Sequence, residues 1–261
     1  MANNDSLANT VKVVLGVSLV CSIVVSTAAV GLRGMQQRNV IEDTQSNILT
    51  VAGADFAGQK IQDVYQQVIE PRVVDLDTGE FVAADQIDVN SFDQRKSAKD
   101  PETSTRLTKD EDIAGIVRRS NYANVYLVKG SAGGYERIII PMHGRGLWST
   151  MYAFMAIQPD GNTVDAMVYY DHGETPGLGG EIANPLWLEK FVGKKLFDDQ
   201  GQPALEVIKG TAPQDSAYQI DGLSGATLTS NGVTNTFDFW LSENGFGKFL
   251  SNIQKGGLGN G

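Results

Sequence analysis

The sequence predicts an α+β protein in which an N-terminal transmembrane helix precedes a soluble domain with a largely antiparallel sheet flanked by helices. This prediction depends on an uncharged run near the N-terminus, two hairpin patterns in the middle of the chain, and helical spacing of apolar residues elsewhere. The length of 261 residues allows one sizeable domain or two small ones. The expected parts are a tail (1–12), a transmembrane helix (13–32), a juxtamembrane linker or helix (33–54), a soluble domain (55–254) and a flexible tail (255–261).

Residues 13–32, VVLGVSLVCSIVVSTAAVGL, contain no charged side chain. A helix needs about 20 apolar residues to cross the roughly 30 Å hydrocarbon core, so this run predicts one membrane span. A cleaved signal peptide is the alternative, but its apolar region is typically only about 7–15 residues long. Lys12 precedes the run, whereas Arg33 and Arg38 follow it. This count favours, by one charge, a cytoplasmic C-terminal side.

The segment after the span predicts an amphipathic helix over 55–69, which Pro71 is expected to end. Its apolar residues recur at helical spacing, and they are Phe56, Ile61, Val64, Tyr65 and Val68. Segment 96–112 is charged and contains proline. We therefore expect a solvated loop or insertion there.

Two β-hairpins are predicted in the middle of the chain. The apolar segments 125–129 and 135–140 flank Ser-Ala-Gly-Gly, and segments 152–158 and 163–170 flank Pro-Asp-Gly-Asn. Turn residues between two such segments are typical of antiparallel neighbours, so the sheet should be at least partly antiparallel. A further strand is expected at 205–209.

The C-terminal part of the chain predicts three helices. Asn184 and Pro185 provide an N-cap and a first-turn proline for a helix that continues through Lys195. A second helix contains Val233 and Phe237, and Asn244-Gly245 is expected to close it. Apolar spacing predicts a short last helix over 246–253.

Charge and cysteine content exclude several classes of site. The chain carries 21 Lys and Arg against 31 Asp and Glu, a formal net charge of −10. Nucleic acids require clustered cations, so we expect no nucleic-acid partner. The single cysteine, Cys21, lies within the uncharged run, which excludes disulfides and cysteine-ligated metal sites from the soluble part. His143 and His172 are too few for a convincing metal centre, so no metal ligand is predicted.

Three glycine-rich loops could carry chemistry, because glycine lets backbone N–H groups approach a ligand closely. They are PMHGRGLW (141–148), HGETPGLGGE (172–181) and DGLSGATLTSNGV (221–233). None has the spacing of a P-loop or of a dinucleotide-binding loop. A triad of Ser224, His172 and Asp221 lacks a nucleophile elbow, so we predict no catalytic residue.

The loop at 221–233 has two explanations from its residues alone. Its hydroxyl groups could simply cap the following helix, with Thr229 or Ser230 at the N-cap, which is a common role for serine and threonine. Thr227 would then lie in the turn just outside the helix N-terminus, where free N–H groups and the helix dipole favour an anion such as phosphate. Gly225 leaves room for that anion. The second explanation is therefore that Thr227 carries a phosphate-linked cofactor.

Segment 221–227, D-G-L-S-G-A-T, resembles the D-x-x-S-G-A-T motif at which a flavin transferase attaches FMN through its phosphate to the final threonine. Together with the segments 172–179 and 144–148 and the N-terminal span, the whole chain resembles the family of C subunits of the sodium-translocating NADH:quinone oxidoreductases. The motif is specific for the FMN-binding superfamily. The Gly-Leu-Trp segment and the chain length separate the sequence, with less force, from the G subunit of the related Rnf complex.

The resemblance implies an electron-carrying subunit with FMN covalently bound to Thr227. A flavin transferase would mature it, and the other subunits of the complex would be its partners. The complex would oxidise NADH, reduce quinone and export sodium. The resemblance also implies a single-pass protein of the bacterial inner membrane with a periplasmic soluble domain, against the count of flanking cations. Two alternatives stay open: an Rnf-type G subunit with the same flavin, and a non-redox membrane-anchored binding or assembly protein.

Residue type suggests further contacts to the flavin. Leu178 and Trp148 would shield the ring faces, and Glu174 and Thr175 would hydrogen-bond to the ring edge or the ribityl chain. Lys209 would neutralise the phosphate or a reduced anionic flavin. Structural roles compete with these, since Trp148 could be core, Glu174 could cap a turn, and Lys209 could be solvated.

The remaining candidates lie in the motif itself or in neighbouring loops. Ser224, Gly225 and Ala226 complete the expected cofactor-binding set around Thr227. His172 and Arg145 are weaker candidates.

Overall fold

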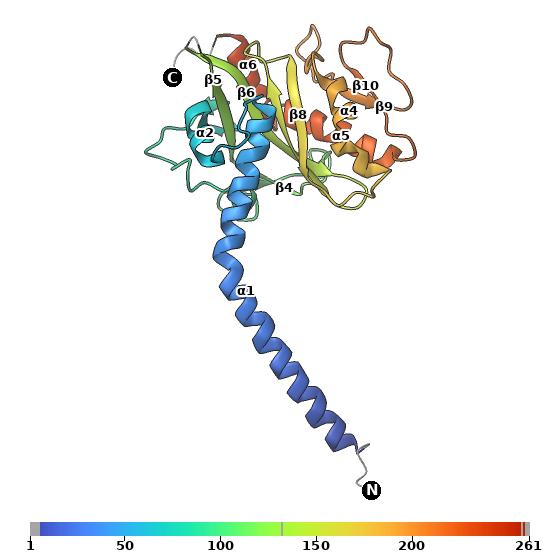
Figure 1. Cartoon of the computed structure of the whole chain (residues 1–261). Helices are drawn as coiled ribbons and strands as arrows, with labels where there is room; N and C mark the ends of the chain where they lie inside the picture. The colour runs from blue at the N-terminus through green and yellow to red at the C-terminus, as the bar shows by residue number, and fades with distance from the viewer. Residues whose placement is uncertain (1–5, 132, 257, 259–261) are drawn as a thin grey trace. The chain divides into compact units, whose positions relative to one another are not determined.

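The computed structural model describes residues 6–131, 133–256 and 258. The chain divides into an N-terminal unit ending at Thr44 and a C-terminal unit, Gln45–Gly261 (Figure 1). Parts of both predicted tails, residues 1–5, 257 and 259–261, lie outside the described residues.

Helix α1, Leu7–Val51, is longer than the predicted span and contains all of it. Residues 7–12, predicted as a tail, are helical, and so is most of the segment predicted as a linker or helix. The apolar side chains of 13–32 are exposed, and α1 is long and apolar enough to cross a membrane. The Thr27 hydroxyl donates to the Ile23 carbonyl over 2.7 Å, so this polar group is satisfied within the helix. The predicted N-terminal apolar helix is confirmed.

A six-stranded antiparallel sheet with the order β2-β1-β5-β6-β7-β8 forms the centre of the C-terminal unit (Figure 1). Its strands are β1 Ile69–Asp75, β2 Glu80–Phe81, β5 Tyr122–Lys129, β6 Tyr135–Arg145, β7 Thr150–Ile157 and β8 Val164–Asp171. The two predicted hairpins are β5–β6 and β7–β8. The predicted antiparallel sheet is confirmed.

Strand β1 was not predicted, because the sequence around Pro71 indicated the end of a helix. Helix α2 covers only Ile61–Val68, so the predicted helix at 55–69 is too long at both ends. Pro71 lies within β1 opposite Tyr126 of β5. On the other side, β2 pairs with β1 only at Val74 and Asp75. The outer edge at Pro71 is therefore not paired by β2, and a residue without an N–H group is tolerated there.

Both faces of the sheet are buried, which explains the continuous apolar runs in its central strands, such as residues 138–142 of β6 and 151–157 of β7. In β7, Met151, Ala153 and Met155 join one core, and Phe154 and Ala156 join the other. The first core also contains side chains of the two C-terminal helices, α5 (Thr227–Leu241) and α6 (Gly247–Gln254). The second contains α2 and the last residues of α1.

Two small sheets complete the unit. Strands β9, Glu206–Ile208, and β10, Gln219–Asp221, form a parallel pair, so the predicted strand at 205–209 is confirmed and its partner is new. Strands β3, Ser104–Arg106, and β4, Arg118–Ser120, pair antiparallel. The predicted loop at 96–112 is therefore partly wrong, because it contains β3, where Ser104 is buried, and the end of helix α3, Gln94–Ser97.

The helix predicted from Asn184 is present but short. The Asn184 side chain accepts a hydrogen bond from the Leu186 N–H over 3.0 Å, as expected for an N-cap. Helix α4, Pro185–Leu188, continues only as the 3-10 turn η2, Glu189–Phe191, so the prediction that it reaches Lys195 is wrong. Likewise α5 ends at Leu241, before the predicted closing pair at 244–245.

His143 lies between aromatic rings at the end of β6. Its ring stacks on Tyr152 at 5.4 Å and contacts Trp240 of α5 at 5.0 Å between centroids. The Trp240 indole N–H donates to the His143 carbonyl over 2.7 Å, which ties α5 to β6. Burial lowers the pKa of His143 to about 4, and the charge of Arg95 acts in the same direction.

The neutral state of His143 predicts a pH-dependent stability. Its unfolded-state pKa of about 6.5 lies above the folded value, so the unfolded chain takes up the proton first as the pH falls. We expect the free energy of unfolding to drop by roughly 2–3 kcal/mol between pH 6.5 and 4.5. Urea titrations of the full chain in detergent measure this. His143→Gln should remove most of the drop, and His172→Gln should leave it. An equal drop in all three proteins would contradict the assignment.

Candidate functional site

The three glycine-rich loops meet at one end of the central sheet. Loop 146–149 connects β6 to β7, and loop 172–178 follows β8. Because β6, β7 and β8 are antiparallel neighbours, the end of β6, the start of β7 and the end of β8 lie at the same edge. A side chain from the first turn of α5 reaches the same place.

One carboxylate joins these segments. Glu174 is only 4% exposed. Its Oε1 accepts hydrogen bonds from the N–H groups of Trp148 at 2.9 Å and Ser149 at 3.2 Å. Its Oε2 accepts from the Leu147 N–H at 3.2 Å and from the Thr229 hydroxyl at 2.6 Å. We call this arrangement of Glu174, residues 147–149 and Thr229 the Glu174 clasp.

The clasp keeps Glu174 ionised. Burial opposes ionisation of the carboxyl, but the hydrogen bonds from Thr229 and from the N–H groups of 147–149 outweigh it and hold the pKa of Glu174 below its ordinary value. The four donors already occupy both oxygens. The structure therefore gives Glu174 a positioning role in place of the direct flavin contact suggested by its residue type.

Two glycines make room for the clasp. A Cβ at Gly146 would lie 2.5 Å from the Glu174 Oε1. A Cβ at Gly179 would lie 2.5 Å from the Thr229 Oγ1 and 2.8 Å from the Glu174 Oε2. These positions admit no side chain without moving the carboxylate. Glycine is needed at positions 146 and 179 because the backbone there passes close to the Glu174 clasp. The sequence had suggested instead that these glycines let the backbone approach a ligand.

Segment 221–227, which contains Thr227, begins at the end of β10, where Asp221 is held by several contacts. The Asp221 carbonyl accepts from the Trp187 indole N–H at 2.8 Å, and its carboxylate accepts from the Ala212 N–H at 2.7 Å. An ion pair with Lys190 completes its contacts. The Lys190 hydrogen bond and the Ala212 N–H hold the pKa of Asp221 below its ordinary value. Asp221 therefore fixes the strand end from which the motif starts.

The N-terminus of α5 differs from the prediction. The N-cap is Ala226, which makes no side-chain capping bond, and Thr227 is the first helical residue. The predicted caps, Thr229 and Ser230, are buried inside the helix. Their hydroxyls are used elsewhere, because Thr229 donates to Glu174 and Ser230 accepts from the Leu223 N–H at 3.1 Å. The prediction that Thr229 or Ser230 caps the helix is therefore wrong.

Sequence reasoning missed the role of Thr229 in the clasp. Thr229 and Glu174 are separated by 55 positions in the sequence. A threonine near the start of a helix is commonly an N-cap, so that role was predicted. The local sequence, Leu228-Thr229-Ser230, shows only hydroxyl residues in the first turn and does not indicate a partner for Thr229.

Thr227 is exposed, and its hydroxyl makes no hydrogen bond with any residue that the structure describes. It stands at the positive end of α5, where backbone N–H groups of the first turn have no helical partner. Gly225 has φ +74°, which glycine adopts without strain, and a Cβ there would lie 3.1 Å from the Leu178 Cδ2. Leu178 of loop 172–178 therefore lies against the motif.

Exposed apolar side chains surround this helix start. Trp148 is 66% exposed and Leu178 is 44% exposed, so the competing role of Trp148 as a core residue is contradicted. Leu228, next to Thr227, is exposed as well. Ser224 and Thr175 are also exposed, whereas Ala226 is buried. A planar apolar group held at Thr227 would find side chains of suitable type here.

Lys209 lies at the start of the motif. It follows β9, and Ile208 of β9 is paired with Asp221 of β10. The Gly222 N–H donates to the Gly210 carbonyl at 2.9 Å, which brings the exposed Lys209 to the same edge as the motif.

The two weaker candidates have structural contacts. The His172 Nδ1 accepts from the Glu174 N–H at 3.3 Å, within loop 172–178. The backbone N–H of Arg145 donates to the Ala114 carbonyl at 2.7 Å, and its side chain is exposed just before loop 146–149.

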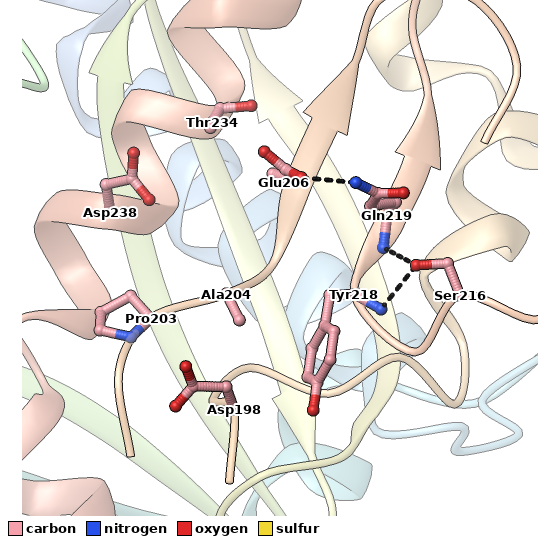
Figure 2. A pocket seen from close by; sticks show the side chains of 9 residues that line it. All are labelled: Asp198, Pro203, Ala204, Glu206, Ser216, Tyr218, Gln219, Thr234 and Asp238. Atoms are coloured by element: carbon pink, nitrogen blue, oxygen red, sulfur yellow. Dashed lines mark hydrogen bonds between the residues drawn. The ribbon is translucent and has the colours of Figure 1, made fainter. Parts of the chain in front are cut away.

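A cavity of about 580 Å³ lies elsewhere, between the β9–β10 pair and the middle of α5 (Figure 2). Its lining includes the carboxylates of Asp198, Glu206 and Asp238 and no lysine or arginine. Burial, reinforced by the charge of Glu206, raises the pKa of Asp238. An acidic lining repels phosphate, and none of the predicted site residues lines this cavity.

Comparison with known proteins matches residues 146–242 to the FMN-binding domain family, a range that contains the Glu174 clasp and Thr227. The chain is 56% identical over 259 residues to the C subunit of the Na(+)-translocating NADH-quinone reductase of Vibrio campbellii, covering 98% of this chain and 99% of that protein. The corresponding protein of Yersinia pestis is 52% identical, with 99% and 97% covered. The crystal structure of Shewanella oneidensis NqrC superposes with a TM-score of 0.75 at 36% identity, covering 81% of this chain and 96% of that one.

The clasp predicts a large effect of one substitution. In Glu174→Gln an amide replaces the charged acceptor, so one side-chain N–H group faces backbone donors. We expect the free energy of unfolding to fall by about 2–4 kcal/mol at pH 7, measured by urea titration. Glu189→Gln, on the exposed turn η2, is the matched control and should change it by less than about 0.5 kcal/mol. Equal stabilities of the two variants would show that the clasp contributes little.

Proposed function

The chain belongs to the family of C subunits of the Na(+)-translocating NADH-quinone reductases, and from this premise we propose that it carries electrons through an FMN bound covalently to Thr227. The resemblance of the motif is thereby confirmed at the level of the family. The covalent proposal rests on one observation: Thr227, the first residue of α5, is exposed, and its hydroxyl makes no hydrogen bond within the described part of the chain.

The surroundings of Thr227 suit a phosphate ester. The threonine oxygen would replace the leaving AMP at the flavin phosphate of FAD, in a step assigned to the flavin transferase, and the hydroxyl proton would be released. The resulting diester retains one negative charge, which the free N–H groups and dipole of α5 stabilise. Gly225 and the exposed Ser224 leave the approach to Thr227 open. Lys209 adds a positive charge at the same edge.

The remaining contacts would orient the flavin. Bound FMN supplies the electron-transfer chemistry, and the chain supplies binding and electrostatics. Trp148 and Leu178 offer apolar surface for the ring faces, and Thr175 is an exposed residue with a hydroxyl for the polar edge or the ribityl chain. Glu174 acts through the clasp, because it fixes the backbone next to Trp148 and the helix next to Thr227.

In the assembled complex this chain would pass electrons between other subunits, while the complex oxidises NADH, reduces quinone and exports sodium. The sequence has no dinucleotide-binding loop, which supports a carrier role over direct NADH oxidation. Helix α1 would anchor the chain in the inner membrane with the C-terminal unit in the periplasm. There a covalent link is useful, because a dissociated FMN would be lost and a tether keeps its local concentration high.

Replacement of Thr227 tests the attachment. When the chain is produced together with a flavin transferase, we expect in-gel flavin fluorescence after denaturation and an intact mass increased by FMN less water. Thr227→Ala should abolish both, because it removes the oxygen that the proposal assigns to the ester bond. Thr175→Ala, an exposed threonine on the neighbouring loop, is the matched control and should keep the covalent flavin. Fluorescence persisting in Thr227→Ala would overturn the attachment site.

The orientation has its own test. A reporter enzyme that is active only in the periplasm, fused to the C-terminus, should be active, and one active only in the cytoplasm should be inactive. The count of cations flanking residues 13–32 favours the opposite result by one charge, but long C-terminal domains are translocated largely regardless of such a margin. Activity of the cytoplasmic reporter alone would reverse the proposed topology.

A further inference from the structure

Exposed apolar side chains of the C-terminal unit gather at the end of the sheet that carries the attachment motif. Among the described residues, this end exposes Ile113, Val117, Leu147, Trp148, Leu178 and Leu228. The flavin and its attachment account for the last three. Ile113, Val117 and Leu147 are left exposed without a role in binding the flavin. Such a group of apolar side chains on one surface is typical of a contact with another molecule.

These three side chains belong to one surface. The Ala114 carbonyl accepts from the Arg145 N–H at 2.7 Å, and a Cβ at Gly115 would lie 2.9 Å from the Arg145 Cβ. The segment that contains Ile113 and Val117 is therefore packed against the end of β6, two residues before Leu147. We name the surface formed by Ile113, Val117, Leu147 and Arg145 the Val117 rim.

Val117 is held in a strained conformation. Its φ of 67° lies in the left-handed region, which is unfavourable for a β-branched residue. The Asp112 carboxylate maintains it by accepting from the N–H groups of Ile116 at 2.7 Å and Val117 at 3.0 Å. The side chain so displayed is 57% exposed. Both the strain and the exposure are unfavourable for the domain alone, and strained residues of this kind are concentrated at functional sites.

The charges of the rim indicate the chemistry of that partner. Asp112 is occupied by the backbone, and Glu111 accepts from the N–H and hydroxyl of Thr108. Arg145 is exposed and makes no ion pair with a described residue. The hydrogen-bonded carboxylates of Asp112 and Glu111 keep their negative charges, and beside them the rim displays apolar side chains and a guanidinium that makes no ion pair with a described residue. Arginine is enriched among the residues that dominate binding energy at protein interfaces, and the aliphatic side chains beside it supply apolar contact area.

We propose that the Val117 rim docks another subunit of the same complex, through an apolar surface with a carboxylate opposite Arg145. The identity of this partner rests on the proposed function, because the rim adjoins the proposed flavin and would bring an electron-transfer partner against it. The rim is small, which is typical of weak electron-transfer contacts.

Crosslinking in the intact complex tests the proposal. A photoreactive benzoylphenylalanine placed at Val117 or at Ile113 should form, in native membranes, an adduct between this chain and a second subunit. The matched control is Val192, which is also exposed but adjoins the opposite end of β8, where the Gly193 N–H donates to the Val164 carbonyl at 2.8 Å. That position lies about 20 Å along the strand from the rim and should give no such adduct.

Two substitutions add a functional measurement. Val117→Asn places a residue that tolerates the left-handed region, so the domain should be at least as stable while docking weakens by about tenfold. Arg145→Glu should weaken docking more than Arg145→Gln, because it opposes the partner carboxylate. The adduct yield and the quinone reduction rate of the complex should fall together, with unchanged covalent flavin. Val192→Asn should alter none of these quantities.

The alternative outcomes overturn the proposal in distinguishable ways. An adduct with lipid alone identifies the rim as a membrane contact, and an adduct between two copies of this chain identifies self-association. Equal adducts at Val117 and Val192, or none at either, show that the rim is not a specific docking surface. If the unsubstituted chain carries no covalent flavin, the proposed function is contradicted. The crosslinking result then still decides whether the rim docks another subunit.

Discussion

A buried carboxylate is costly unless its charge is fully hydrogen-bonded, and the site of this protein is arranged around one. Glu174 is withdrawn from solvent and accepts four hydrogen bonds, three from the backbone of loop 146–149 and one from Thr229 of α5. Loss of any donor leaves a less compensated charge. The two loops and the start of α5 are therefore held as one unit, so the backbone beside Trp148 and the helix turn that carries Thr227 are fixed together.

Local patterns predicted the parts of the fold that local interactions determine. The uncharged run, the two hairpins and the Asn184 cap each depend on residues close in sequence, and all are present. Strand β1 was missed because Pro71 and the helical spacing before it suggested a helix end. It is a strand because its neighbours in the sheet are supplied by β5 and β2. The parallel partner of β9 likewise depends on pairing that no short segment reveals.

The candidate site also has parts that local sequence predicted and parts that depend on contacts between distant residues. The motif and its threonine were identified from sequence, and the glycines beside it were noticed, but the purpose of Gly146 and Gly179 was misjudged. Their neighbours are Glu174 and Thr229, which the fold brings together from 55 positions apart. The same contact explains the error at the start of α5. Helix α5 begins at Thr227, so Thr229 lies inside its first turn, where its hydroxyl donates to the Glu174 carboxylate and caps nothing.

The proposed covalent link would also explain why the side chains around Thr227 are exposed. A ligand held only by noncovalent contacts usually needs a cavity that buries most of its area. The acid-lined cavity beside β9 is formed by other residues than those around Thr227. The proposed phosphate ester at Thr227 would remove the need for burial, because the tether would supply the local concentration that affinity would otherwise have to supply. The side chains facing the proposed flavin can then stay exposed, as Trp148 and Leu178 are. An electron carrier benefits from that exposure, since a partner must approach the flavin ring closely. A protein that retained its flavin only by enclosing it would block that approach.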